Sequence, residues 1–224
     1  MEKPYKKVKE FIGSKLYSGE LKAGDKIPSE RELTEILGIS RNSVREGLKT
    51  MENLGVIESQ HGSGNFITRN FEKTMFDVMT FMYILNNIDN AQITEFRYAL
   101  EWEAMNLIVG NLTDSQKETL LYHLIQLEEA DDEKIRVIHD KAIHYFLIEA
   151  TNNEYMTANY KALIKTMDLY IPKMRSKIIT GMQGDRQLRY AHRLIVEGAV
   201  EGDLEKGLDG LKKHFQYINT YQND

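Results

Sequence analysis

The sequence predicts a mainly α-helical protein, with an N-terminal winged helix-turn-helix over residues 1–70 and a C-terminal all-α bundle of about seven helices over residues 71–224. Three observations lead to this prediction. Two capped helices joined by a short turn precede a Gly-rich hairpin. From residue 71 the helical periodicity continues with a single proline, Pro172, and without a clear strand signal. The charge divides as well, since residues 1–70 carry 12 Lys and Arg against 10 Asp and Glu, and residues 71–224 carry 17 against 24.

The composition excludes several classes of protein. The 224 residues are 42% apolar and 28% charged, which is ordinary for a globular protein. The absence of cysteine excludes a disulfide scaffold, a cysteine nucleophile, an iron–sulfur cluster and a thiolate zinc site. No stretch approaches about 18 uninterrupted apolar residues, and the N-terminus leads into an amphipathic segment rather than the apolar core of a signal peptide. We therefore expect a cytoplasmic protein with no membrane partner.

The first predicted helix covers residues 5–18. Its apolar side chains recur on one helical face, and three lysines lie off that face. Two glycines and a proline between residues 19 and 28 then indicate a connector. The apolar face consists of Tyr5, Val8, Phe11, Ile12 and Leu16.

The next two helices are marked by their caps. Ser29 and Glu32 have the spacing of a capping box, and Gly38 is the expected left-handed cap at the end of that helix. Ser40 caps the following helix, which Gly55 ends. Two helices joined by so short a turn form a helix-turn-helix. We expect the inward faces to consist of Leu33, Ile36 and Leu37 in the first helix and Val44, Leu48, Met51 and Leu54 in the second.

A hairpin follows the two helices. Residues 56–60 and 65–68 can form strands, and the segment between them contains two glycines. This hairpin is the predicted wing. His61 and the flexible Gly62 and Gly64 of its tip suit a contact with the minor groove or the backbone of DNA.

The rest of the chain is predicted as helices alone. Thr113 to Gln116 form another capping box, and Asp203 after Gly202 caps the last helix. The expected helices cover residues 71–87, 91–110, 114–129, 132–151, 154–179, 185–201 and 204–221.

The helix that starts after Ser40 carries a basic ridge. Arg41, Arg45 and Lys49 lie at i, i+4 and i+8 and face away from the predicted core, as does Asn42. A recognition helix needs this arrangement, because an arginine bonds guanine O6 and N7 with two hydrogen bonds. Arg31, near the start of the preceding helix, can reach a phosphate or a base edge. The alternative is that these are solvated charges on a small helical domain.

The N-terminal segment resembles the GntR family of bacterial transcription regulators. The resemblance is carried by Ile27 to Leu33, Leu37 to Leu48, Leu54 to Ile57 and Gly62 to Ile67. It implies a homodimer on a short palindromic operator in double-stranded DNA. It also implies DNA contacts at Arg31, Ser40, Arg41, Asn42, Ser43, Arg45 and the wing tip His61 to Gly64, with Asn42-Ser43 standing where many members have Thr-Pro.

Histidines concentrate in the helical half. Asp140 and His144 lie at i, i+4 and project from one helix face, and His192 and His214 lie on two later helices. If these helices converge, three imidazoles and a carboxylate suit Zn²⁺, Ni²⁺, Mn²⁺ or Fe²⁺. The spacing also fits a local Asp–His hydrogen bond and isolated core or surface histidines. His123 and His139 are expected to be of that second kind, with His139 on the surface.

Residues 71–224 resemble the helical effector domain, often called FCD, of the FadR-type branch of the same family. The resemblance is carried by Glu95 to Glu101, Asp140 to His144, Ala191 to Ile195, Gly202-Asp203 and Lys213-His214. It implies one divalent metal ion held by Asp140, His144, His192 and His214. It also implies a small organic or sugar acid effector bound by Arg97, although Arg97 also fits an i, i+4 pair with Glu101.

These inferences favour a ligand-responsive transcription regulator, of a kind that is usually a repressor, with no catalytic residues. Two alternatives stay open. The protein could sense the ion itself, or it could carry a metal-dependent hydrolase for which no general base is identifiable. An acyl-CoA-responsive regulator is disfavoured, because that branch lacks the metal-binding residues.

Overall fold

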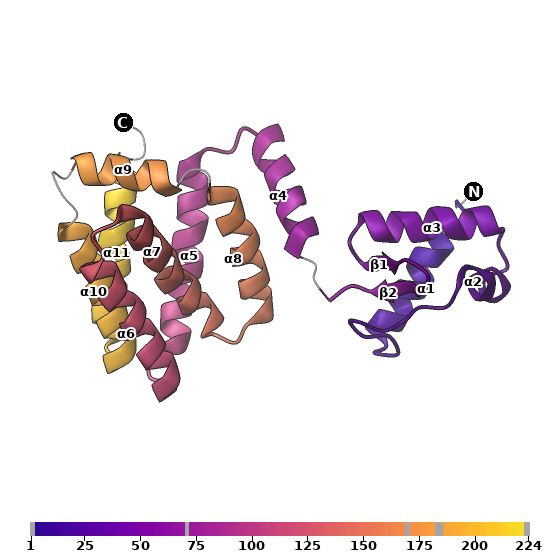
Figure 1. The fold of residues 1–224 in the computed structure, drawn as a ribbon, viewed down its shortest axis with the longest axis horizontal. Helices are drawn as coiled ribbons and strands as arrows, with labels where there is room; N and C mark the ends of the chain where they lie inside the picture. Colours follow the sequence, from indigo (N-terminus) through magenta and orange to yellow (C-terminus); the bar gives the residue numbers. More distant parts are fainter. Residues whose placement is uncertain (1–2, 70–71, 169–170, 182–185, 222–224) are drawn as a thin grey trace. The chain divides into compact units, whose positions relative to one another are not determined.

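The computed structural model describes residues 3–69, 72–168, 171–181 and 186–221, and Figure 1 labels its helices and strands. The chain divides into two compact units, Met1–Thr74 and Met75–Asp224. Helices dominate both units, and one two-stranded sheet lies in the first. The predicted fold class, a winged helix-turn-helix followed by an all-α bundle, is therefore confirmed.

The N-terminal unit has the predicted order of elements. The strands are antiparallel, with Ile57 opposite Ile67 and Gln60 opposite Gly64, and they form the wing. The core is formed by Val8, Ile12, Leu33, Val44, Leu48, Met51, Ile57 and Ile67, with Ile27 from the connector. The elements are α1 (Lys6–Tyr17), α2 (Glu30–Leu37), α3 (Arg41–Asn53), β1 (Ile57–Gln60) and β2 (Gly64–Ile67).

The caps of the helix-turn-helix form as the sequence predicts. The Ser29 hydroxyl accepts a hydrogen bond from the Glu32 amide at 3.3 Å, and the Glu32 carboxylate accepts one from the Ser29 amide at 2.8 Å. Gly38 takes the left-handed conformation with φ 61°, and the Ser40 hydroxyl accepts from the Ser43 amide at 3.2 Å. These local bonds set the turn between α2 and α3.

A glycine brings α3 close to α1. A Cβ atom on Gly47 would lie 2.6 Å from Val8 Cβ and 2.8 Å from the Tyr5 carbonyl oxygen, so no larger residue fits there without movement. Because this face of α3 is held against α1, its opposite face points to solvent.

Two predicted core positions are wrong. Ile36 is 55% exposed and Leu54 is 42% exposed, although both fit the apolar periodicity. Helix α2 has only eight residues and packs against α1 and α3 through its buried Leu33, so Ile36 is left in contact with solvent. Leu54 lies one residue past the end of α3.

The remaining elements are all helices. Helices α5 to α8, α10 and α11 form a bundle, α9 runs across one end of it, and α4 stands at its side (Figure 1). Over the described residues from 72 onward there are eight helices rather than about seven. They are α4 (Glu72–Leu85), α5 (Asn90–Ile108), α6 (Asp114–Glu129), α7 (Glu133–Glu149), α8 (Glu154–Met167), α9 (Ile171–Gly181), α10 (Arg186–Glu201) and α11 (Leu204–Tyr221).

The eighth helix arises because the helix expected over 154–179 is broken. Helix α8 ends at Met167 and α9 begins at Ile171. Pro172 explains the break, since proline has no amide hydrogen for the carbonyl four residues earlier and fits only the first turn of a helix. The periodicity continues across this point, which is why the pattern alone predicts one helix.

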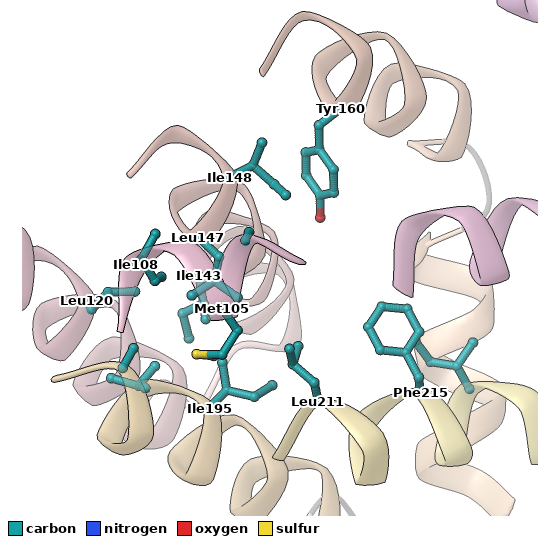
Figure 2. Close-up of a cluster of buried hydrophobic side chains, with 14 of the residues drawn as sticks. Met105, Ile108, Leu120, Ile143, Leu147, Ile148, Tyr160, Ile195, Leu211 and Phe215 are labelled. Atoms are coloured by element: carbon teal, nitrogen blue, oxygen red, sulfur yellow. The ribbon is translucent and has the colours of Figure 1, made fainter. Parts of the chain in front are cut away.

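The core of the bundle is formed by α5, α6, α7, α10 and α11, with α8 packed alongside α5 and α7. Figure 2 shows side chains from α5, α6, α7, α10 and α11 meeting with Tyr160 of α8. The fully buried members include Met105, Ile108, Leu120, Ile143, Leu147, Ile148, Tyr160 and Ile195. None of the helices within the described ranges is long and apolar enough to cross a bilayer.

Helices α10 and α11 pack unusually closely. A Cβ on Gly198 would lie 2.3 Å from the Gly207 backbone nitrogen, and one on Gly210 would lie 2.6 Å from the Ile195 nitrogen. The Asp203 side chain caps α11 by accepting from the Lys206 amide at 3.0 Å, as predicted. This close hairpin brings side chains one turn further along the two helices within reach of one another.

The burial pattern of α7 predicts unequal effects of two identical substitutions. Ile148→Ala should lower the free energy of unfolding by about 2–5 kcal/mol, because the fully buried side chain leaves a cavity. Ile138→Ala, on the same helix at 61% exposure, should change it by less than about 0.5 kcal/mol. Urea unfolding of the full chain, followed by circular dichroism, measures both. Equal losses would contradict this packing.

Candidate functional site

The exposed face of α3 carries the predicted basic ridge. Arg41, Arg45 and Lys49 are all exposed, while Val44 and Leu48 are buried on the opposite face. Such a helix can present its side chains to the edges of base pairs. The ridge is thus held in place by the core of the N-terminal unit.

Two ridge cations have acidic neighbours. The Arg45 Nε donates to Glu30 Oε2 at 2.8 Å, and the Lys49 ammonium donates to Glu52 Oε2 at 2.8 Å. Arg41 has no ion pair within the described part of the chain. Exposed pairs of this kind contribute at most about 1 kcal/mol. They orient the side chains, and a nucleic acid can displace them.

The other predicted DNA-contacting residues lie around this ridge. Arg31 lies in the first turn of α2, where its Nε is 3.9 Å from Glu35. Asn42 is exposed in the first turn of α3, and the Ser40 and Ser43 hydroxyls lie 3.0 Å apart at its start. At the wing tip His61, Gly62 and Gly64 are exposed, and both glycines have positive φ, 73° and 108°. A side chain at either glycine would be strained, which keeps the tip narrow.

The bundle holds a second cluster of functional side chains. Asp140 and His144 project from α7, His192 from α10 and His214 from α11. All four are buried, and no more than 6% of any residue is exposed. Ligand nitrogens of the three histidines lie within 4.8 Å of one another. The structure therefore brings together the four residues that the sequence singles out.

The distances in this cluster are short. His144 Nε2 lies 3.2 Å from His192 Nε2 and 3.6 Å from Asp140 Oδ1. His192 Nε2 lies 3.3 Å from Asp140 Oδ2. Two imidazole nitrogens and two carboxylate oxygens thus face a common point between α7 and α10.

The outer nitrogens of two rings determine what the inner nitrogens can do. The His192 Nδ1 lies 2.8 Å from the Leu188 carbonyl oxygen, and the His144 Nδ1 lies 2.5 Å from Glu101 Oε2. Both partners only accept, so each Nδ1 carries the hydrogen and a neutral ring turns its Nε2 lone pair inward. Two lone pairs 3.2 Å apart repel each other, and a cation between them would remove the repulsion.

The third ring is unsatisfied. Neither His214 nitrogen has a hydrogen-bond partner among the described residues, although both are fully buried. A buried polar atom without a partner costs about 1–3 kcal/mol. The His214 ring also lies against the other two rings, with centroids 4.4 Å from His144 and 4.6 Å from His192. One of the two unpartnered nitrogens of a neutral ring carries a lone pair, and this lone pair suits a metal ion.

The electrostatics favour the ligating forms of His144, His214 and Asp140. Burial lowers the pKa of His144, with Glu101 opposing it, and burial together with His144 and His192 holds the pKa of His214 well below its usual range. Burial raises the pKa of Asp140, but His192 and Arg175 outweigh it and hold that pKa well below its usual value. Neutral imidazoles and a carboxylate are the forms that bind divalent metals.

Glu101 connects the cluster to Arg97. The Arg97 Nε donates to Glu101 Oε1 at 2.6 Å, and the Tyr160 hydroxyl donates to the same oxygen at 2.6 Å. Burial raises the pKa of Glu101, whereas Arg97 and His144 lower it more strongly, so the carboxylate stays charged. The i, i+4 alternative for Arg97 is therefore present in the structure. A carboxylate behind a ligating histidine orients the ring.

Some residues around the cluster carried no sequence signal. Tyr160 and Arg175 enter it from α8 and α9, and only the packing of these helices brings them there. The reading of His139 as a surface residue is wrong in part. It is half-buried, and its Nδ1 lies 3.0 Å from the Nδ1 of His123 on the neighbouring helix.

Comparison with known proteins identifies both halves of the chain. Residues 4–67 match the model of the bacterial regulatory proteins of the gntR family, and residues 92–217 match the FCD domain. The second match alone covers more than half of the chain.

Curated relatives span most of the chain. A putative L-lactate dehydrogenase operon regulatory protein of Escherichia coli is 26% identical over 209 residues, 89% of this chain and 79% of the relative. The transcriptional regulator YcbG of Bacillus subtilis is 28% identical over 216 residues, 95% of this chain and 87% of its own.

A solved structure, the GntR protein of Streptococcus agalactiae, matches with a TM-score of 0.68 at 22% identity. The match covers 97% of this chain and 99% of that one, and it supports the same fold. The two domain matches and the regulators among the relatives agree with the helix-turn-helix and the helical bundle described above. The chain belongs to the GntR family of bacterial DNA-binding transcription regulators and carries an FCD effector-binding domain.

Proposed function

We propose that this regulator holds one divalent metal ion at Asp140, His144, His192 and His214, and that a small carboxylate effector bound beside the ion changes its affinity for DNA. The observation that carries the proposal is the inward direction of two Nε2 lone pairs 3.2 Å apart, next to an unpartnered buried His214. A bound Zn²⁺, Ni²⁺, Mn²⁺ or Fe²⁺ ion supplies a Lewis-acidic position for an oxygen ligand.

The names of the relatives support a small carboxylate. One is described as a putative regulator of an L-lactate dehydrogenase operon, and L-lactate is a small hydroxy acid. In this family the FCD domain is the domain that binds the effector. We propose that DNA is bound by a homodimer on a palindromic site, through the ridge of α3 and the wing. Effector binding shifts the affinity for DNA by a coupling free energy of about 1–3 kcal/mol.

The test measures metal content, carboxylate binding and DNA binding on the same protein. Untagged protein is stripped with a chelator, reloaded with Zn²⁺, Ni²⁺ or Mn²⁺, and titrated onto a DNA duplex selected from a random library. We expect one ion per chain, a selected duplex with two-fold symmetry, and a change of DNA affinity by roughly 5- to 150-fold when a carboxylate is added to the metal-loaded form.

Two outcomes would contradict the proposal. If the protein takes up less than about a tenth of an equivalent of each of these ions, the metal-binding part of the proposal is wrong. If the metal alone changes DNA affinity and no carboxylate adds to the change, the protein senses the ion itself. Ionic strength is held constant throughout, because protein–DNA affinity depends steeply on salt.

A further inference from the structure

Arg175 is a buried arginine that is only partly paired. It lies on α9, 3% of it is exposed, and its Nε and Nη1 donate to Glu133 and Asp140. Its Nη2 is fully buried and has no hydrogen-bond partner among the described residues. A guanidinium presents its donors as a planar fork, so the free Nη2 lies beside the Nη1 that bonds Asp140. One of the two guanidinium donors that could bind an anion in a bidentate manner therefore has no partner.

A small cavity lies at this arginine. It measures about 20 Å³ and is lined by Arg175, Asp140, His214 and Arg97, with Leu188 and Ile218 as apolar walls. Two of the lining residues, Arg175 and His214, carry the unpaired buried nitrogens. A cavity of this size holds one water, so a carboxylate enters only if the Arg175 side chain or α9 shifts.

The charges favour an anion at this position. The buried acids that face the two arginines are Glu101 and Asp140, and the half-buried Glu133 is shared by Arg175 and Arg136. Arg97 and Arg175 together with a divalent ion would bring four positive charges. Buried charge without compensation is costly, and a carboxylate would reduce the excess of positive charge.

Arg97 and Arg175 differ in the hydrogen bonds that they already make. The Arg97 Nε donates to Glu101 at 2.6 Å and to the Tyr160 hydroxyl at 3.2 Å, and the same Glu101 accepts from the His144 ring. Moving Arg97 would disturb the orientation of His144. Arg175 shares Asp140 with the proposed ion, and its Nη2 is still available to donate a hydrogen bond.

We propose that Arg175 binds the carboxylate of the effector through Nη1 and Nη2, and that Arg97 is a positioning residue that holds Glu101 against His144. The inference rests on the proposed function and specifies its ligand site. The ligand carboxylate takes the place of Asp140 on Nη1 and occupies the free Nη2, while Asp140 is left to the ion. Such bidentate pairs are about twice as strong as neutral hydrogen bonds.

The experiment compares variants of the full-length, Zn²⁺-loaded protein. Acetate, glycolate, L-lactate and succinate are screened by thermal shift, and the best binder is titrated by calorimetry alongside its uncharged amide. Arg175→Gln should weaken the acid by roughly 10- to 100-fold, because a hydrogen bond to a charged partner is lost. Arg175→Lys keeps the positive charge but loses the planar pair of donors. Its affinity for the acid should lie between those of the parent and Arg175→Gln. Arg193→Gln, at an arginine with a half-exposed side chain on α10, is the matched control and should bind as the parent does.

The comparison of the acid with its uncharged amide separates carboxylate binding by Arg175 from a purely structural role of this residue. The parent should prefer the acid strongly, and Arg175→Gln should lose that preference while it keeps one Zn²⁺ and the parental circular dichroism spectrum. Three outcomes would overturn the assignment: parental affinity in Arg175→Gln, loss of zinc in both Arg175 variants, or loss of acid preference in Arg97→Gln alone. If the parent itself takes up zinc and binds none of the four acids, the proposed carboxylate effector fails together with this inference.

Discussion

His192→Ala should release the metal ion from the bundle. The imidazole is fully buried, its Nε2 faces His144 and Asp140, and alanine offers no ligand atom. Loss of a residue that only orients a ligand weakens metal binding by about 10- to 100-fold, so loss of a ligand itself should cost more than about 100-fold. Elemental analysis after desalting gives the stoichiometry, and competition with a chromogenic chelator gives the affinity.

The matched control is His123→Ala. His123 is a half-buried histidine on α6 that pairs with His139 and lies outside the cluster. It should keep one ion per chain. Removal of the ion should also lower the melting temperature of the parent and leave that of His192→Ala unchanged, because a ligand stabilises only the state that binds it. A full equivalent of metal in His192→Ala would contradict the assignment of this residue.

His192→Ala should still bind DNA. The predicted DNA contacts all lie between residues 31 and 64, in the other compact unit. We therefore expect the variant to retain its direct contacts with DNA and to lose its response to a carboxylate. This pattern distinguishes a failed sensor from a misfolded protein.

Arg45→Ala should remove most of the sequence-specific DNA affinity. The side chain is exposed at the centre of the α3 ridge, and a two-bond contact with a base contributes about 1–3 kcal/mol per half-site. On a two-fold operator the effect counts twice, which corresponds to roughly 30-fold to more than 10,000-fold weaker binding. Removal of Arg45 also leaves Glu30 without its partner, and that negative charge opposes DNA further.

The measurement is fluorescence anisotropy at one salt concentration with the selected duplex and with a scrambled one. Arg45→Ala should approach the affinity of the parent for the scrambled duplex. Lys49→Ala serves as the comparison, because a lysine on a phosphate should weaken both duplexes equally and reduce the salt slope by about 1. If Arg45→Ala distinguishes the two duplexes as well as the parent does, α3 is not the reading helix.

Local signals in the sequence predict much of the fold. The capping boxes at Ser29 and Thr113, the Ser40 cap and the left-handed Gly38 all form as expected. Each depends on hydrogen bonds between residues two to four positions apart, so the sequence contains both partners within one short segment. The same holds for the Asp140–His144 spacing, since the two residues share a helix face.

Other predictions fail where burial depends on neighbours. Ile36 and Leu54 keep the apolar period and yet are exposed, because none of the described elements covers them. The single helix expected over 154–179 is two helices. Pro172 cannot donate the hydrogen bond that a continuous helix needs, and this effect outweighs the helical periodicity of the apolar residues.

By itself the sequence determined the winged helix-turn-helix, the basic ridge and the identity of four residues suited to a metal ion. Only the tertiary structure decided that Glu101 takes up Arg97, that the His192 and His144 rings turn their Nε2 atoms inward, and that Arg175 on α9 joins the cluster. The reason is physical. Apart from the Arg97–Glu101 pair and the bond of His192 to the Leu188 carbonyl, these contacts join residues 35 to 48 positions apart. Such distant groups meet only when packed helices bring them together. Within one helix Arg97 could pair with Glu101 or stay free, and the buried setting of Tyr160 and His144 selected the pair.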